Sequence, residues 1–456
     1  MPEAVPCDLV ITNAYIYIDS EREIAGGWIA LAEGRVHSVG ADPRQTPAAT
    51  TRIDAQGRLV TPGLVNVHHH MYQNLTRSYA PVVNASLFDW LTMLYPMWAE
   101  IDDESVYLST WVAMAELLLG GCTLSSDHMY VHPRRELIDA QIRAATDLGF
   151  RFYANRGSMT RSTADGGLPP VTVVQDADEI LADCVRLIDG YHDPSPGAMT
   201  RIALAPCSPF SVTPQFMAET ARLAESRDVR LHTHLAEDRD ELTYCRQVYG
   251  MTPVEYFEDA GWLHDRSWVA HFIFPSAPEE SRMAAAGVGV AHCPSSNMLI
   301  GGGTADVQRL RRLGAPVGLG CDGSASTDHG SLWLEARAAL TLGRYRGGST
   351  AMTARDVLAM ATQGGAACLG WADETGHLRP GACADLVIWT GSPVALAGAL
   401  TDPVEAWLRC GPMTADTTIV AGRVVVRDGR IQDPGLDAVL AAHAAQARRI
   451  QKVSLR

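Results

Sequence analysis

The sequence predicts an α/β protein: a (β/α)8 barrel of the TIM type, with a small β-sandwich domain formed by both ends of the chain. Between Val65 and Gly370, apolar runs of roughly four to seven residues alternate with amphipathic helical segments, about eight times in all. Both ends instead contain short strand-like runs separated by Gly and polar turns, a pattern typical of hairpins. These two sequence patterns predict the barrel and the β-sandwich, respectively.

The length of 456 residues suits one large domain with a smaller companion. We expect residues 1–60 to form the first part of the β-sandwich domain and residues 61–372 to form the barrel. Residues 373–456 should complete the β-sandwich domain and end in a C-terminal helix.

The composition excludes several classes of partner. A formal net charge of -15 and scattered basic residues disfavour nucleic acid and anionic membrane surfaces, which attract clustered cations. We find no apolar stretch of about 20 residues that would span a bilayer. The ten cysteines contain no C-x-x-C pair, and the first residues lack the pattern of a secretory leader. We therefore expect a cytoplasmic protein with free thiols, and neither nucleic acid nor a membrane as partner.

Lysine is almost absent, since Lys452 in the C-terminal tail is the single one. A Walker-type phosphate loop and a Schiff-base lysine both require a lysine inside the fold. A carboxylated lysine bridging two metal ions requires one as well. The sequence therefore excludes these three chemistries.

Unusual polar residues follow the predicted barrel strands. In TIM barrels the chemistry takes place at the carboxyl ends of the strands. The polar residues at or just beyond a strand end are His68, His70, His128, Arg156, Cys207, His234, His271, His292 and Asp322.

Four of these residue positions suggest one metal site. A strand ending in His68-His69-His70 points alternate side chains to one face, so His68 and His70 can share an ion, and imidazole suits zinc or iron. His234 and Asp322 end two further strands. Taken alone, each has an ordinary alternative: a surface cluster, a core histidine, or a helix N-cap for the Asp. Their occurrence together at the strand ends of one barrel predicts a metal site.

Two further residues are candidates for proton transfer. Glu237 follows His234 by three residues, so it can move a proton beside the metal without binding it. His271 ends the SWVAHFIF strand, where the alternative is a packed core histidine.

The motif set resembles the amidohydrolase superfamily, and within it the mononuclear deaminase branch, over nearly the whole chain, including the closing segment GHLRPGACADLVIW. The resemblance implies one divalent metal ion per chain, zinc in the first place with iron as the alternative, held by His68, His70, His234 and Asp322. Binuclear members carry a carboxylated lysine on strand four, where this chain reads RIALAPCSPF.

The resemblance also implies a mechanism. The ion acidifies a water molecule, Asp322 takes its proton, and His271 orients the nucleophile and stabilises charge at the attacked carbon. Glu237 then delivers protons to a ring nitrogen and to the leaving group. Ammonia leaves from a tetrahedral intermediate.

Within the branch, the segments HHHMYQNLTR, LFDWL, APCSPFS and HCPSSNM are most similar to 8-oxoguanine deaminases. They also resemble isoxanthopterin deaminases and the s-triazine aminohydrolases. The expected reaction is hydrolysis of a small heterocyclic substrate, 8-oxoguanine, to urate and ammonia. The alternatives are a pterin deaminase and an s-triazine aminohydrolase or chlorohydrolase; a non-catalytic barrel is disfavoured because the ligand set is complete.

Four residues are predicted to bind the substrate. Gln73 can present its amide to a ring N–H and carbonyl, unless it caps a helix, and Arg156 can hold a ring oxygen, unless it forms an internal salt bridge. Trp90 can stack on the ring, although an aromatic side chain beside a barrel is more often core. Cys207 stands where adenosine-type deaminases have a His, which favours a free base over a nucleoside.

Some features stay open. The 8-oxoguanine deaminases usually have Cys where this chain has Phe272 and Ser295. The Gly- and Pro-rich segment 161–170 is long enough to cover a pocket. The sequence assigns no role to His128 or His292. We expect a homo-oligomer, a dimer or larger.

Overall fold

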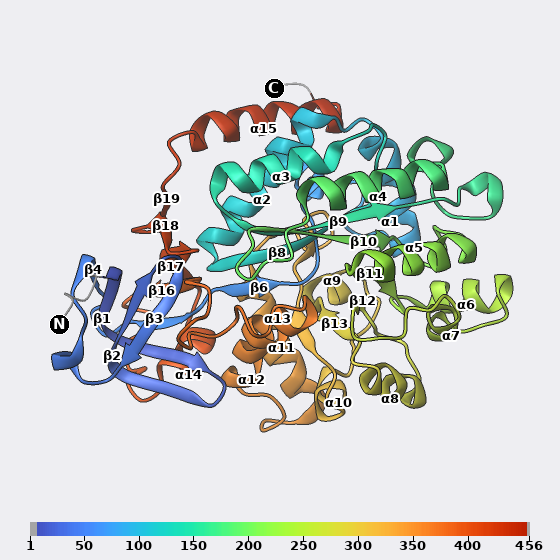
Figure 1. Ribbon diagram of the computed structural model, residues 1–456. Helices are drawn as coiled ribbons and strands as arrows, with labels where there is room; N and C mark the ends of the chain where they lie inside the picture. Colours follow the sequence, from blue (N-terminus) through green and yellow to red (C-terminus); the bar gives the residue numbers. More distant parts are fainter. Residues whose placement is uncertain (1–6, 454–456) are drawn as a thin grey trace.

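The computed structural model describes residues 7–453 and contains a closed barrel of eight parallel strands, which confirms the predicted fold class (Figure 1). The strands follow chain order around the barrel, and β14 closes it by pairing with β6 through Leu319 and Asn66. The barrel strands are β6 (Leu64–Asn66), β8 (Cys122–Met129), β9 (Arg151–Ser158), β10 (Thr200–Pro206), β11 (Arg230–Leu235), β12 (Ser267–His271), β13 (Gly289–His292) and β14 (Val317–Leu319).

Helices cover the outside of the barrel (Figure 1). Within residues 7–453, none of them combines the length and apolarity needed to cross a bilayer. The helices of the barrel region are α1 (Leu87–Trp98), α2 (Asp103–Leu119), α3 (Leu137–Leu148), α4 (Ala177–Tyr191), α5 (Pro214–Arg227), α6 (Arg239–Val248), α7 (Pro253–Asp259), α8 (Ala277–Ala285), α9 (Pro294–Leu299), α10 (Val307–Arg312), α11 (Leu332–Gly347), α12 (Ala354–Ala359) and α13 (Gly365–Cys368).

Successive residues of each barrel strand face opposite sides, as the period of two requires. On β9, Tyr153 packs in the cluster that fills the barrel interior, together with Val65 and Trp268. Its neighbours Phe152 and Ala154 pack in the large cluster between strands and helices. The parity of a residue on its strand therefore decides whether it faces the interior or the helices.

The two chain ends meet in one nine-stranded sheet. Strand β5 from the N-terminal part pairs antiparallel with β16 from the C-terminal part, with Pro62 opposite Leu386. Strands from both ends share one apolar core, which contains Ile16 and Ile388. The strands of this sheet are β1 (Cys7–Asp19), β2 (Arg22–Ala32), β3 (Arg35–Gly40), β4 (Ala49–Asp54), β5 (Leu59–Pro62), β16 (Leu386–Gly391), β17 (Met413–Val420), β18 (Arg423–Arg427) and β19 (Arg430–Ile431).

The C-terminal helix α15 (Leu436–Gln451) leaves this sheet and lies along the barrel beside α2 (Figure 1). Arg449 Nη2 contacts Asp102 Oδ2 at 2.9 Å, and Gln451 Nε2 donates to the carbonyl oxygen of Leu75 at 2.7 Å. The shorter helix α14 (Pro403–Arg409) connects β16 to β17. The last helix thus holds the segment around Leu75, which follows the His68–His70 run.

A buried ion pair joins the barrel to the sheet. Arg151 at the start of β9 binds both carboxylate oxygens of Asp385, at 2.7 and 3.0 Å, and both side chains are almost fully shielded from solvent. Asp385 also accepts the backbone N–H of Ala421 at 2.7 Å. Loss of one partner would leave the other charge buried without compensation.

We predict that Asp385→Asn lowers the free energy of unfolding by about 3–5 kcal/mol, because it leaves the Arg151 guanidinium buried and unpaired. Denaturant unfolding followed by circular dichroism measures this. The control is Asp42→Asn, which breaks the exposed pair between Asp42 and Arg44 and should leave the midpoint unchanged. Equal midpoints for wild type and both variants would contradict the prediction.

Candidate metal centre

The first and last barrel strands continue into a short parallel pair, β7 (His69–His70) and β15 (Asp322–Gly323). Asp322 pairs with His69, and its backbone N–H donates to the carbonyl oxygen of His68 at 3.0 Å. Asp322 has a φ of 57°, a left-handed conformation that is uncommon for a residue with a side chain. This backbone path places the Asp322 carboxylate beside His68 and His70.

His70 and His234 each hold a proton on the ring nitrogen that faces away from the cluster. His70 Nδ1 donates to the carbonyl oxygen of His128 at 2.6 Å, and His234 Nδ1 donates to that of Cys207 at 2.7 Å. Burial lowers the pKa of both rings, which keeps them neutral. A neutral imidazole with its proton on Nδ1 has a lone pair on Nε2. Both rings therefore present Nε2 as a possible metal ligand.

His68 reaches the same state through another histidine. His232 Nδ1 donates to the carbonyl oxygen of Trp268 at 3.0 Å, and burial lowers the pKa of His232 to about 3, so its Nε2 is an acceptor. His68 Nδ1 lies 2.8 Å from this nitrogen and supplies the proton. His68 Nε2 is buried without a hydrogen-bond partner and carries a lone pair.

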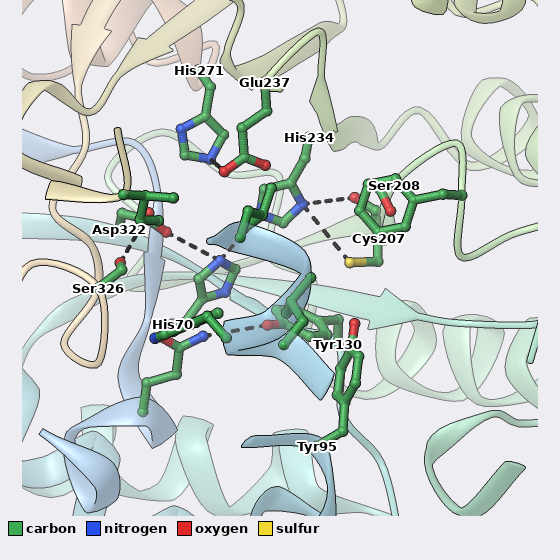
Figure 2. A pocket seen from close by; sticks show the side chains of 16 residues that line it. His70, Tyr95, Tyr130, Cys207, Ser208, His234, Glu237, His271, Asp322 and Ser326 are labelled. Carbon is green, nitrogen blue, oxygen red and sulfur yellow. Dashed lines mark hydrogen bonds and ion pairs between the residues drawn. The ribbon is translucent and has the colours of Figure 1, made fainter. Parts of the chain in front are cut away.

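Two of the free nitrogen atoms lie beside one carboxylate oxygen, and the third lies beside one of these nitrogen atoms (Figure 2 shows His70, His234 and Asp322). Asp322 Oδ1 lies 3.3 Å from Nε2 of both His68 and His70, and His70 Nε2 lies 3.1 Å from His234 Nε2. A tetrahedral zinc ion bound at about 2.0–2.1 Å separates its ligand atoms by about 3.3 Å. Lone pairs this close repel one another unless a cation lies between them. The four residues therefore fit one divalent metal ion.

Two further groupings are also compact enough to hold an ion, His68 with His128 and His232, and His68 with His234 and His271. In the first of these the nitrogen atoms are already engaged, because His68 Nδ1 bonds to His232 and His128 Nε2 donates to a backbone carbonyl at 2.8 Å. The grouping that contains Asp322 also supplies an anionic oxygen to a divalent cation. The chemistry of the donors thus favours the Asp322 set.

Two serine hydroxyls orient the Asp322 carboxylate. Ser296 Oγ and Ser326 Oγ donate to Oδ2 at 2.5 and 3.2 Å, which leaves Oδ1 for the histidines. Burial alone would raise the pKa of Asp322, but the histidines around it, His271 among them, hold it well below its usual value. Asp322 is therefore an anion in this site.

Glu237 is placed by a left-handed turn at the end of β11. Ala236 has a φ of 52°, and both oxygens of Glu241 brace the turn by accepting the backbone N–H groups of Ala236 and Glu237 at 2.9 and 2.8 Å. Burial raises the pKa of Glu237 to about 7. A carboxyl group in this range can both give and take a proton near neutral pH.

His271 adopts a φ of 69° at the end of β12 and faces Glu237. Its Nδ1 donates to Asn297 Oδ1 at 2.8 Å, and its Nε2 lies 3.5 Å from Glu237 Oε1 (Figure 2). Burial lowers the pKa of His271, but the carboxylates of Glu237 and Asp322 outweigh this effect and raise it above its usual value. The pair can therefore hold a proton beside the metal ligands.

A cavity of about 410 Å³, partly open to solvent, lies over the cluster. One face of α1 forms its apolar wall, with Phe210 and Ile300 beside it. The predicted site residues that line the cavity are His70, Gln73, Trp90, Cys207, His234, Glu237, His271 and Asp322.

Three predicted substrate-binding residues thus reach the cavity. Gln73 Nε2 donates to the Tyr130 hydroxyl at 3.3 Å, while its Oε1 is buried without a partner. Gly323 makes room for this amide, because a Cβ there would overlap it. Trp90 Nε1 donates to a backbone carbonyl at 3.1 Å, which fixes its ring. Cys207 is an un-ionised thiol, since burial raises its pKa to about 12.

The structure does not bring Arg156, the fourth of these residues, to the cavity. Its side chain points from β9 toward α4, where Nε bonds to Asp183 at 2.6 Å and Nη2 donates to Gln175 at 2.9 Å. The reason is strand parity: Arg156 shares the outward face with Phe152 and Ala154. The internal salt bridge, the alternative considered for this residue, is what forms.

The segment 161–170 also lies away from the cavity. Arg161 Nη1 donates to the Tyr249 hydroxyl at 2.7 Å, and the Tyr244 hydroxyl donates to the carbonyl oxygen of Gly166 at 3.0 Å. The segment therefore packs on α6 and the turn after it, and α1 covers the cavity instead. Phe272 and Ser295, the two departures from the 8-oxoguanine deaminase pattern, do not line the cavity either.

The two histidines without an assigned role support the barrel. His128 offers its carbonyl oxygen to His70 and does not line the cavity. His292 is buried at the end of β13, where burial lowers its pKa to about 3, and it is also outside the cavity lining.

Several residues of the site were not predicted from the sequence. Tyr130 lies directly after the end of β8, two positions beyond His128, and this spacing is a signal that was available. Ser296 and Asn297 lie in α9, and Glu241 lies in α6, where single polar residues carry no signal of the contacts they make. Tyr95 was hidden among the apolar residues of α1.

We predict that zinc stabilises the wild-type chain and not Asp322→Ala. A ligand at a thousand times its Kd stabilises the folded state by about 4 kcal/mol, and the variant lacks the anionic donor. Thermal unfolding after chelation and after zinc addition measures the shift, with metal content determined in parallel. Asp328→Ala, a nearby acidic residue outside the cavity lining, is the control and should retain the full shift. One zinc per chain with an undiminished shift in Asp322→Ala would contradict the prediction.

The chain is 46% identical to the 8-oxoguanine deaminase of Pseudomonas aeruginosa over 426 residues, covering 93% of this chain and 94% of that protein. It is 36% identical to the hydroxydechloroatrazine ethylaminohydrolase of Pseudomonas sp. (strain ADP), covering 91% and 89% of the two chains.

The fold agrees with these sequence relations. The crystal structure of atrazine chlorohydrolase from Arthrobacter aurescens TC1, complexed with zinc, superposes with a TM-score of 0.91 at 32% identity, covering 96% of this chain and all of that one (100%). The profile of the amidohydrolase family matches residues 59–425, which contain the barrel and the whole candidate site. The chain belongs to the amidohydrolase family.

Proposed function

We propose that this protein is a metal-dependent deaminase that hydrolyses 8-oxoguanine to urate and ammonia. The observation that carries the proposal is the buried pair of Glu237 and His271, 3.5 Å apart, in the same cavity as the metal-type ligands. This arrangement supplies separate groups for water activation and for protonation of a leaving amine. The 8-oxoguanine deaminase that is 46% identical to this chain, and matches it almost end to end, supports 8-oxoguanine as the substrate.

We propose that one zinc ion binds through Nε2 of His68, His70 and His234 and through Asp322 Oδ1. The neutral state of the three rings and the anionic state of Asp322 support this assignment. The zinc in the related chlorohydrolase structure supports the choice of metal, and iron is the alternative. When bound, the ion supplies Lewis acidity that makes water a nucleophile near neutral pH.

Asp322 and His271 then act on the attacking water. Asp322 accepts its proton, and two serine hydroxyls hold the carboxylate in place through Oδ2. His271 keeps its Nδ1 proton on Asn297, so Nε2 is directed to the nucleophile and to the oxygen formed at the attacked carbon. The raised pKa of His271 favours the protonated ring, which stabilises negative charge there.

Glu237 moves the protons on the substrate side. Its carboxyl group, with a pKa of about 7, donates to a ring nitrogen as the water attacks. It then delivers a proton to the exocyclic amine, which leaves as ammonia. An amine must be protonated to leave and chloride need not be, so this placement favours deamination over dechlorination.

The remaining cavity residues fit a flat heterocycle. Trp90 offers an indole face at the wall of the cavity, and Gln73 Oε1 offers an unpaired acceptor to a ring N–H. Apolar residues of α1 exclude water from the ring, which strengthens every polar contact in the cavity.

We further propose that the enzyme works in the cytoplasm as a homo-oligomer. All ten cysteines are free thiols and nine of them are buried, which fits a reducing compartment. Exposed apolar side chains at Met298, Leu334 and Tyr345 border one open groove, which fits a contact between copies of the chain. Sedimentation analysis of the purified protein would reveal a monomer if the proposed homo-oligomer does not form.

Ammonia release by the zinc-loaded protein tests the substrate. The assay compares 8-oxoguanine, isoxanthopterin, guanine and amino-triazines, and we expect the highest kcat/KM for 8-oxoguanine. Release of an alkylamine or chloride from a triazine, with no ammonia from any purine or pterin, would replace this substrate with a triazine. Preference for isoxanthopterin would make the enzyme a pterin deaminase.

We predict that Glu237→Gln lowers kcat for ammonia release by about 10² to 10⁴, because the amide cannot transfer a proton. Zinc content and thermal stability should remain those of the wild type. The matched control is Glu335→Gln: Glu335 is fully buried, with a pKa raised to about 8, so its neutral form resembles Gln, and it does not line the cavity. Full activity in Glu237→Gln would contradict the proton-transfer role.

A further inference from the structure

Three buried polar atoms of the cavity lining have no hydrogen-bond partner among the described residues: His271 Nε2, Gln73 Oε1 and the Tyr95 hydroxyl. Buried polar groups are normally paired, and a group left unpaired at a cavity wall can be paired by a ligand. His271 and Gln73 already have partners in the proposed reaction. Tyr95 has none, and its residue type in an apolar helix gave no sign of function.

The fold fixes Tyr95 firmly in this position. It belongs to the buried face of α1, which repeats every three or four residues and includes Leu91, Leu94 and Trp98. Its ring packs edge-on against Trp98, with centroids 6.1 Å apart. Tyr95 lies across the site from Glu237 and His271, and its hydroxyl is directed back toward the other labelled side chains (Figure 2). The hydroxyl therefore faces the end of the cavity opposite the proton-transfer groups.

The chemistry of this hydroxyl is that of a donor. Burial, with the nearby Cys207 and Tyr72, raises the pKa of Tyr95 well above its usual value, so the phenol keeps its proton. A neutral phenol in an apolar wall gains most from an acceptor oxygen that arrives without water. A ring substituent such as a methyl or alkylamino group offers no such acceptor.

We infer that Tyr95 is a specificity-determining residue, which donates a hydrogen bond to an exocyclic oxygen at the end of the substrate remote from the departing amine. The inference rests on the proposed function, because that function places the reacting carbon beside Glu237 and His271. In 8-oxoguanine the reacting carbon is C2, and C8 lies at the opposite end of the purine. Tyr95 therefore contacts the oxygen on C8, the one non-hydrogen atom that distinguishes this base from guanine.

The test is Tyr95→Phe, which removes one oxygen atom and keeps the ring that packs in α1. We expect kcat/KM for 8-oxoguanine to fall about 10-fold, mainly through KM, and kcat/KM for guanine to change less than about twofold. The ratio of the two therefore falls about 10-fold. Tyr17→Phe is the matched control, because Tyr17 in β1 also has a buried hydroxyl without a partner and lies outside the cavity.

Each outcome decides the inference. An unchanged ratio in Tyr95→Phe, with an active wild type, overturns the role of Tyr95 and leaves the proposed function standing. An equal fall for both bases, with a lowered unfolding temperature, shows a structural role and overturns it as well. A wild type that releases no ammonia from any oxo-substituted ring overturns the proposed function, and this inference with it.

Discussion

The whole site depends on hydrogen bonds that fix which nitrogen of each histidine carries the proton. Backbone carbonyls of neighbouring strands accept from Nδ1 of His70 and His234, and His232 passes the same constraint from Trp268 to His68. Because these acceptors belong to the barrel backbone, the rings can neither flip nor change tautomer without breaking buried bonds. The closed barrel thus holds three imidazole lone pairs and one carboxylate oxygen around the same candidate metal position.

Three residues with a strained backbone lie where this position meets the cavity. Ala236, His271 and Asp322 all have left-handed conformations, which cost of order 1–3 kcal/mol each for residues with side chains. Each is held by specific bonds: Ala236 by Glu241, His271 by Asn297 and Asp322 by the bridge between β15 and β7. The strain turns the side chains of the strand ends inward over the barrel. The stability of the barrel and of the nine-stranded sheet therefore maintains the strained geometry of the site.

The sequence allowed prediction of the features that depend on local pattern. The alternation of strands and helices predicted the barrel, and the positions of His68, His70, His234 and Asp322 at strand ends predicted the cluster that the structure brings together. The missing lysine pointed to a single ion. Contacts between distant segments carry no such pattern, so the two serines that orient Asp322 were not predicted.

Two predictions failed or fell short for identifiable reasons. Arg156 lies near the end of β9, but its side chain faces outward, away from the barrel interior. The face that a strand residue takes is uncertain in a sequence until the strand register is known. The Gly- and Pro-rich composition of residues 161–170 suggested that this loop covers the cavity, but α1 covers it instead. The sequence of an amphipathic helix does not show which part of the protein its apolar face contacts. Tyr95 was overlooked for the same reason, since a tyrosine at a core position is usually core.

The most direct test of this account is a crystal structure of the zinc-loaded protein, with the metal located by anomalous scattering. The account predicts one ion per chain, bound by Nε2 of His68, His70 and His234 and by Asp322 Oδ1, with each Nδ1 still bonded as described above. Two ions in the barrel, coordination through Nδ1 of any of these rings, or an ion bound without Asp322 would contradict it.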